Sequence, residues 1–326
     1  MERAFMDIYG FLNSYAGRYL IQSFLHSLTA AVIVTALINI WKIESPLLLQ
    51  KFCCIVILLP MISFPVYHLL NPVRGDASFR MNALFDSSRW VDLALLGKVP
   101  VSLLLISLFV GMSLVLACRE LINLARQWIQ SKKKCPVNAG VRSPVKGILS
   151  ELHAPILDDC VIENDDPVLF TTLTGRKPTI VLSSGLLRIL SHDQLKAALA
   201  HEAAHTTRHS RFILTLLFLI RIIMFYNPVT FIAFKIATLD EEKICDDIAA
   251  LWTGKPQVLA DALKSLCLSG EGAENVSGSV SIYGINMMIK DRVERLERKA
   301  DQQVSLPWLK LALTSLTIGI INYYIV

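Results

Sequence analysis

The sequence predicts a multi-pass α-helical membrane protein that carries an α+β domain between its third and fourth membrane spans. Of its 326 residues, 53 % are apolar and only 18 % are charged, whereas soluble domains have about a quarter charged residues. Four apolar segments are each about long enough to cross a bilayer. The stretch between the last two contains strand and helix patterns. These observations argue against an ordinary soluble protein. They predict that the lipid bilayer is one partner of the chain.

The predicted spans are apolar segments with few interruptions, and they cover residues 19–40, 52–70, 99–117 and 306–326. Pro60 and Pro65 predict a kink in the second span. Lys310 lies near the start of the last span, where its long side chain can reach the interface. The predicted organisation is therefore an N-terminal membrane region over 1–118, a domain over 119–305 and a C-terminal span over 306–326.

Basic residues set the predicted orientation. Seven lysines and arginines follow the third span between residues 119 and 146, with Glu120 as the only acid. Such clusters remain in the cytoplasm, so residues 119–305 are expected to face the cytosol and the loop 71–98 the outside. The net charge of +5 comes with no nucleic-acid-binding motif, and we interpret it as a topology signal without direct nucleic-acid binding.

The cytosolic domain is expected to begin with short strands, at Val161–Glu163, Val168–Thr172 and Pro178–Leu182. A helix follows them. Ser191 is its predicted N-cap, and Gln194 completes a capping box. The helix is expected to run to about His209.

This helix contains the pattern His201-Glu202-x-x-His205. Two histidines four residues apart share one helix face and can hold one metal ion. Zinc accepts neutral imidazole nitrogens, and a catalytic zinc site keeps one position open for water. Glu202 can then act as the general base toward that water. The pattern predicts metal-dependent hydrolysis.

A third protein ligand is expected further along the chain. Glu242 and Asp246 stand one helical turn apart and share a face, so one can bind the metal while the other orients a ligand histidine. Glu241 competes for the ligand role, but it aligns with Cys245 and leaves Asp246 on another face. We interpret Cys245 as a packing residue.

An apolar segment over 212–234 separates the two halves of this site. It contains Arg221 and a break before Pro228. Because about twenty-three residues cannot cross a bilayer twice, we expect a re-entrant or interfacial helical hairpin. In it, Asn227 caps a helix that runs from Pro228 to near Gly254. The alternatives are a buried segment of the cytosolic domain and a full crossing that would split the site.

A charged helix is predicted over Asp291–Lys299. Its charges are most simply explained by a solvated face. Substrate binding by Arg292 and Arg295 is the alternative.

Together these features resemble the M56 family of membrane metallopeptidases, which contains the BlaR1- and MecR1-type transducers, and more distantly the HtpX-like M48 group. The resemblance rests on the strand Lys177–Ser183, the His201–His205 motif, the Asn227-Pro228 break and Glu242-x-x-Cys-Asp246. It implies a gluzincin-like cytosolic zinc metalloprotease domain in a bacterial inner membrane.

The roles expected from this resemblance are as follows. Zn²⁺ is held by His201, His205 and Glu242, with Glu202 as general base and Asp246 as a residue that orients a ligand. The strand formed by Thr179, Ile180, Val181 and Leu182 is expected to offer its edge to an extended substrate.

Two departures from the family pattern matter. Relatives often carry an acid a few residues after the second histidine, where this chain has Ser210. Relatives that sense β-lactams carry an extracellular sensor domain after the last span, whereas this sequence stops at Val326. We therefore expect no direct antibiotic sensing by acylation, and a separate sensor protein as a partner.

Three functions remain open at this point. The first is a site-specific endopeptidase in signal transduction that cuts a cytosolic or membrane-associated protein, such as a winged-helix repressor, or itself. The second is a non-catalytic membrane transducer with a structural zinc ion. The third is an M48-type quality-control protease. The sequence leaves both a monomer and a homo-oligomer open.

Overall fold

The computed structural model describes residues 10–12, 14–87, 110–119, 121–122, 145–152, 158–162, 169–174, 177–208, 210–271, 289–298 and 306–326, with scattered residues between 89 and 108 and residues 165 and 167. Most of these residues are helical. The chain divides into two compact units. The first comprises residues 1–127, 214–238 and 303–326, and the second comprises 128–213 and 239–302.

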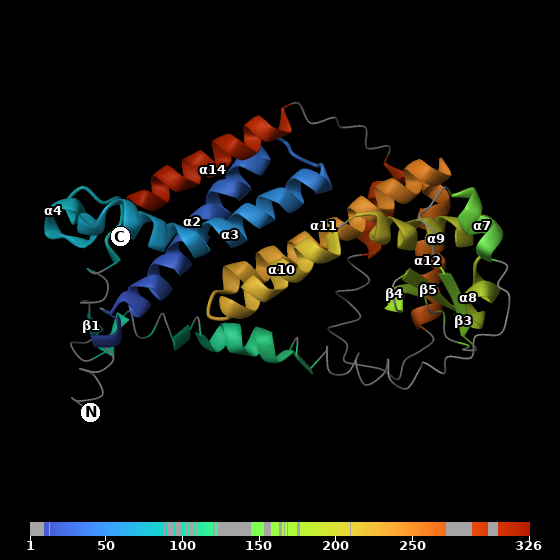
Figure 1. Ribbon diagram of the computed structural model, residues 1–326, viewed down its shortest axis with the longest axis horizontal. Helices are drawn as coiled ribbons and strands as arrows, with labels where there is room; N and C mark the ends of the chain where they lie inside the picture. The colour runs from blue at the N-terminus through green and yellow to red at the C-terminus, as the bar shows by residue number, and fades with distance from the viewer. Residues whose placement is uncertain are drawn as a thin grey trace. The chain divides into compact units, whose positions relative to one another are not determined.

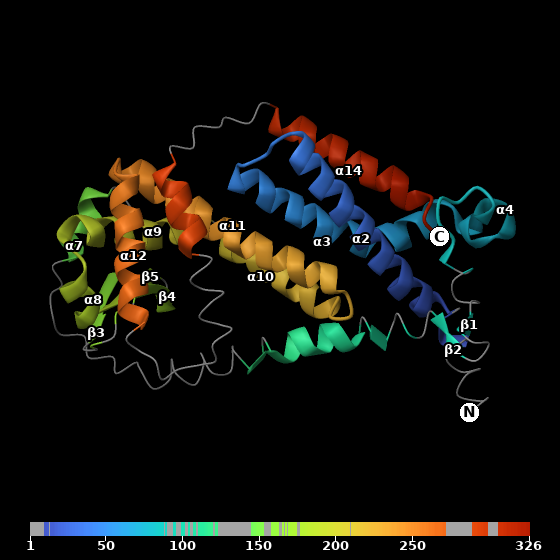
Figure 2. The same ribbon diagram turned by 180° about the vertical axis from the view of Figure 1, so that it is seen from behind.

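The first unit is built on three long apolar helices: α2 (Tyr15–Ile40), α3 (Pro46–Leu70) and α14 (Pro307–Tyr323). They lie side by side in both views (Figures 1 and 2). Within the described residues, α2 and α3 are long and apolar enough to cross a membrane. Both start a few residues before the predicted spans, because Ser14 and Pro46 begin the helices earlier than the apolar runs do.

The third predicted span begins later than expected. Val99 and Pro100 form β2, which pairs antiparallel with β1 (Ala94–Leu95). The described residues from 101 to 119 are helical, and those over Val110–Arg119 form an apolar helix. The predicted start at residue 99 was wrong because hydropathy does not distinguish apolar residues of a short strand from the first residues of a membrane helix. Two short helical segments, η1 (Pro72–Gly75) and α4 (Ala77–Arg80), follow α3.

The apolar segment between the halves of the site forms a helical hairpin. Helix α10 (Ser210–Ile223) and the start of α11 (Pro228–Thr253) run next to each other. The Asn227 Oδ1 atom accepts a hydrogen bond from the Val229 backbone N–H at 3.1 Å, as expected for the cap. Buried Leu217 and Met224 join the core formed by α2 and α3. The hairpin therefore packs with the apolar helices, and not in the core of the second unit.

The second unit contains a three-stranded sheet of β3 (Asp158–Ile162), β4 (Leu169–Thr174) and β5 (Lys177–Ser183) in the order β3-β5-β4. Strand β5 pairs parallel with β3 and antiparallel with β4. The prediction that Thr179, Ile180, Val181 and Leu182 offer a free edge is therefore wrong, since both edges of β5 are occupied. Its apolar run reflects burial at the centre of the sheet.

Four helices complete the second unit: α7 (Val145–Glu151), α8 (Ser184–Ile189), α9 (His192–Thr207) and α12 (Pro256–Glu271). Residues 289–297 are also helical, and α11 contributes its part from residue 239 onward. Helix α9 packs against β4, β5 and α12. Buried residues at the centre, including Leu182, Leu199 and Leu259, hold these elements together and fix the position of α9.

Candidate metal centre

Helix α9 presents two histidines on one face. Ser191 caps the helix and Gln194 closes the capping box, as predicted. His201 and His205 then stand one turn apart, with ring centroids separated by 4.9 Å. The other side of the helix is rich in buried alanines, which allow it to pack closely against the sheet and α12. The packing of α9 thus leaves both imidazole rings on the same face of the helix.

Glu242 of α11 completes the group. Its Oε2 atom lies 3.4 Å from Nε2 of His201, and its Oε1 atom lies 3.6 Å from Nε2 of His205. All three ligand atoms lie within 4.8 Å of one another. Zinc bonds of about 2.0–2.1 Å in a tetrahedron require ligand atoms about 3.3 Å apart. The donor set and its spacing therefore fit a tetrahedral zinc ion.

Asp246 orients the first histidine. Its Oδ1 atom lies 2.9 Å from Nδ1 of His201, an ion-pair contact that favours a proton on Nδ1, while Nε2 faces Glu242. Burial opposes charge on both groups, but Arg292 and His201 hold the pKa of Asp246 at about 2. Asp246 is therefore ionised at neutral pH, and it favours the neutral His201 tautomer with Nε2 free once a metal displaces the second proton.

His205 contacts the sulfur of Cys245, which we interpreted from the sequence as a packing residue. Cys245 Sγ lies 3.2 Å from Nδ1 of His205 and 3.7 Å from Oε1 of Glu241. Burial, together with Glu241 and Glu242, raises the pKa of the Cys245 thiol. The protonated thiol can then donate to Glu241 while its sulfur accepts from His205 Nδ1–H. This arrangement again leaves Nε2 directed at Glu242.

Glu241 occupies a different position from Glu242. It is buried, with only 2 % of its side chain exposed, and its Oε1 atom lies 3.4 Å from Nε of Arg208. His205, Glu241 and Cys245 form a second group with metal-binding atoms. The arginine partner and the protonated thiol make that group a poorer cation site than the one with Glu242. The spacing of the acids did not reveal Arg208, because the contact joins residues distant in sequence.

A guanidinium group holds both acids of the candidate centre. Arg292 donates from Nε and Nη2 to the two carboxylate oxygens of Asp246, each at 2.7 Å, and its Nη1 lies 3.3 Å from Glu242. Arg295 binds Asp247 in the same way, with one contact of 2.8 Å. The interpretation of these arginines as a solvated face is therefore wrong. A charge pattern alone does not show that an acidic helix lies opposite.

Replacement of Arg292 tests this arrangement. Arg292→Lys keeps the charge but loses the planar fork that holds both oxygens of Asp246. We expect zinc affinity or activity to fall about 10–100-fold, as changes next to metal ligands do. Competition with a chromogenic chelator measures the affinity. Arg295→Lys, which alters the equivalent pair with Asp247, is the control. Equal losses in both variants would show a general effect on helix packing.

Glu202 lies on α9 between His201 and His205 in sequence, and its charge raises the pKa of His205 against the larger effect of burial. The Glu242 side chain is 37 % exposed, so the centre is open to solvent on its side. Residues 179–182 do not join this group. They lie in β5, whose Ile180 and Leu182 are fully buried.

The described residues thus bring together His201, His205 and the Glu242 carboxylate, with side chains that orient both imidazoles. Glu202 lies between the two histidines in sequence. This geometry is suited to metal-dependent hydrolysis. A comparison with protein-family models gives a match to the family described as BlaR1 peptidase M56, over residues 161–296. The matched region extends from β3 to the helix of Arg292 and includes all the residues of the centre. This match supports a member of the M56 family of metallopeptidases.

Proposed function

We propose that this protein is a membrane-embedded, zinc-dependent endopeptidase that cleaves a cytosolic or membrane-associated protein in a signalling response. The observation that carries the proposal is the centre itself. Nε2 of His201 and of His205 lie 3.4 and 3.6 Å from the Glu242 carboxylate, with Glu202 between the two histidines in sequence. The M56 match supports peptide bonds as the substrate class.

Each residue has a separable task in this proposal. His201, His205 and Glu242 hold zinc, which supplies a Lewis acid for the peptide carbonyl when it is bound. The Glu202 carboxylate accepts the proton of the attacking water and delivers it to the leaving amine. Asp246 and Cys245 keep the two imidazoles in the required tautomer. Arg292 keeps Asp246 and Glu242 in place.

Substrate pairing moves from β5 to β4 in this proposal. Within the described sheet, β4 has only β5 as a neighbour, and it packs against α9. An extended peptide can add to the outer edge of such a strand through its backbone hydrogen bonds. Leu169–Thr174 is the segment we expect to bind it. Strand β3 is the other outer strand of this sheet. We prefer β4 because α9, the helix that carries His201 and His205, packs against it.

The proposed location is the bacterial cytoplasmic membrane, with the catalytic unit facing the cytosol. Two described helices with the length and composition of membrane spans support membrane insertion, and the basic cluster over 119–146 supports the orientation. A cytosolic centre can reach a winged-helix repressor or the protein's own chain. A separate sensor protein would then supply the stimulus.

Comparative proteomics tests the proposed function. Membrane and cytosolic fractions from cells with the wild type are compared with those from cells with Glu202→Ala, and new protein N-termini are identified. A single new N-terminus that depends on Glu202 supports a site-specific signalling peptidase. Many dependent N-termini indicate a quality-control protease. Signalling that survives Glu202→Ala contradicts the peptidase proposal and supports a transducer with a structural zinc.

Zinc binding is expected to release about one proton at pH 7. Burial opposes it, but the contacts with Asp246 and Glu242 raise the pKa of His201 to about 9 in the metal-free protein. A histidine binds zinc only as the neutral imidazole, so the extra proton of His201 must leave when zinc binds. Apparent affinity should therefore rise by about tenfold per pH unit between pH 7 and 9.

Calorimetric titrations in buffers of different ionisation enthalpy measure this proton release. Asp246→Asn removes a carboxylate that favours the charged imidazole, so the release should decrease in that variant. A binding enthalpy that does not depend on the buffer would contradict the prediction.

A further inference from the structure

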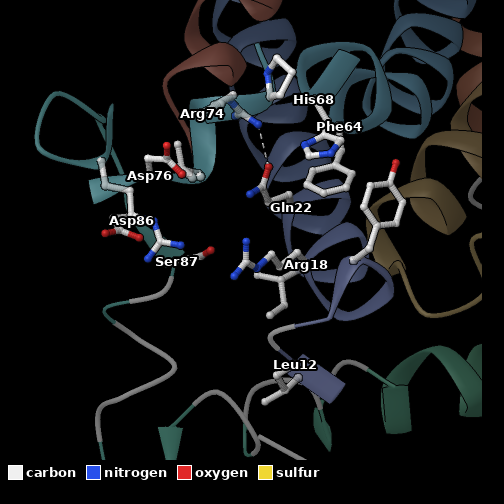
Figure 3. A pocket seen from close by; sticks show the side chains of 15 residues that line it. Leu12, Arg18, Gln22, Phe64, His68, Arg74, Asp76, Asp86 and Ser87 are labelled. Carbon is white, nitrogen blue, oxygen red and sulfur yellow. Dashed lines mark hydrogen bonds between the residues drawn. The ribbon is translucent and has the colours of Figure 1, made fainter. Parts of the chain in front are cut away.

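The first unit contains a cavity of about 450 Å³. It lies where the N-terminal part of α2 meets the end of α3 and the η1–α4 segment, and polar side chains converge on it (Figure 3). Small-molecule sites typically have volumes of about 300–1,000 Å³. The peptidase centre is formed by other residues, all in the second unit, so this cavity has no part in the proposed hydrolysis.

Arg74 is the buried cation of the cavity wall, with only 4 % of its surface exposed. It donates to the backbone carbonyls of Tyr323 at 2.9 Å, Asn322 at 3.0 Å and Ile325. Its Nη1 donates to Oε1 of Gln22 at 3.0 Å. No described carboxylate forms an ion pair with it. A buried charge held only by neutral oxygens keeps a positive potential in the cavity.

Gln22 connects this cation to the open part of the cavity. Because its oxygen accepts from Arg74, its amide nitrogen is left as a donor, and that nitrogen has no protein partner among the described residues. Figure 3 shows Gln22 between Arg74 and Arg18, with the Arg74 contact drawn as a dashed line. An amide held by a buried guanidinium is a fixed donor for an oxyanion.

Arg18 supplies a second cation on the same helix face, one turn before Gln22. A Cβ atom on Gly75 would lie 3.5 Å from Nη1 of Arg18, so the guanidinium rests against the η1 backbone. Arg18 is exposed and forms no ion pair with a described residue. Its fork therefore remains open to a ligand.

The charges of the lining favour an anion. Three arginines (Arg18, Arg74 and Arg80) face two acids, Asp76 and Asp86. Asp86 is paired with Arg89, which lies outside the lining, at 3.5 Å. The rings of Tyr15 and Phe64, with centroids 5.2 Å apart, form an apolar wall. A ligand with one anionic head and an apolar part matches this combination.

We propose that this cavity binds a small oxyanion, a phosphate or carboxylate group, between Arg18 and the amide of Gln22. Guanidinium groups bind both anions through paired hydrogen bonds. The same chemistry is offered by a soluble anion and by the headgroup of an anionic lipid. The site adds a ligand-binding function to the first unit that does not depend on the metal centre.

The test uses the full chain in a non-ionic, phosphate-free detergent. Inorganic phosphate and succinate are titrated at constant ionic strength, and calorimetry reports binding. Phosphatidylglycerol is added separately, and native mass spectrometry reports the lipid retained. Arg18→Gln removes the open cation. Gln22→Glu keeps the side-chain shape but places a carboxylate against Arg74. Lys235→Gln, an exposed residue of the same unit outside the cavity lining, is the charge-matched control.

Saturable binding of at least one probe is expected, with losses of about tenfold or more in Arg18→Gln and Gln22→Glu and none in Lys235→Gln. Saturation by phosphate or succinate identifies a soluble anion, whereas retention of phosphatidylglycerol alone identifies a lipid headgroup. Absence of saturable binding in the wild type overturns the proposal. Equal losses in Arg18→Gln and Lys235→Gln overturn it as well, because they show non-specific charge attraction. Unfolding midpoints measured without probe show whether Arg18→Gln is folded. If it is not, the binding measured for Gln22→Glu decides the result.

Discussion

A Glu202→Gln variant is expected to keep one equivalent of zinc and to lose peptidase activity by about 10²–10⁴-fold. The magnitude is that of a general acid–base group in the transition state. The amide has nearly the shape of the carboxylate, but it cannot accept a proton from water at neutral pH. The ligands His201, His205 and Glu242 are unchanged, so the metal should remain. Binding and catalysis are therefore separated in one substitution.

The measurement combines metal analysis with cleavage of the substrate identified by proteomics. Glu297→Gln makes the same chemical change at an exposed carboxylate that pairs with Lys264 at 2.6 Å, and it should leave activity near that of the wild type. Cleavage by Glu202→Gln at the wild-type rate would exclude Glu202 as the general base. Loss of zinc together with activity would instead indicate a role in holding the metal.

The parts of the structure that the sequence could predict are those determined by local patterns. The cap at Ser191, the cap at Asn227 and the end of α11 before Gly254 were all predicted correctly. Gly254 has a φ of 67°, a conformation that glycine adopts without strain. Helical spacing also placed Glu242 and Asp246 on one face. Each of these depends on residues within a few positions of one another.

The parts that failed depend on contacts between distant residues. The order β3-β5-β4 places β5 at the centre, and an apolar strand pattern does not distinguish a central strand from an edge strand. The contact of Arg292 with Asp246 joins residues 46 positions apart. Cys245 became a partner of His205 only because α9 and α11 meet there. The hydrophobic periodicity of a helix or strand carries no information about such contacts.

Glu242→Gln is expected to lower zinc affinity by more than the roughly 10–100-fold that changes beside a ligand cause, with loss of activity. The carboxylate lies between both Nε2 atoms, and an amide oxygen is neutral and a weaker zinc ligand than a carboxylate. Glu241→Gln is the matched control, because the two glutamates are adjacent in sequence. It should retain zinc, although the loss of charge beside Arg208 is expected to lower stability, because the pair is buried.

Zinc content after dialysis and chelator competition distinguish the two residues, and thermal unfolding measures the stability of each variant. Zinc retained by Glu242→Gln but lost by Glu241→Gln would place the ion among His205, Glu241 and Cys245, the alternative group. That result would also require a deprotonated Cys245, although burial and the neighbouring acids raise the pKa of its thiol. Because this electrostatic environment opposes a thiolate, we expect the ion to be held by Glu242, where Arg292 and the two imidazoles stabilise an ionised carboxylate.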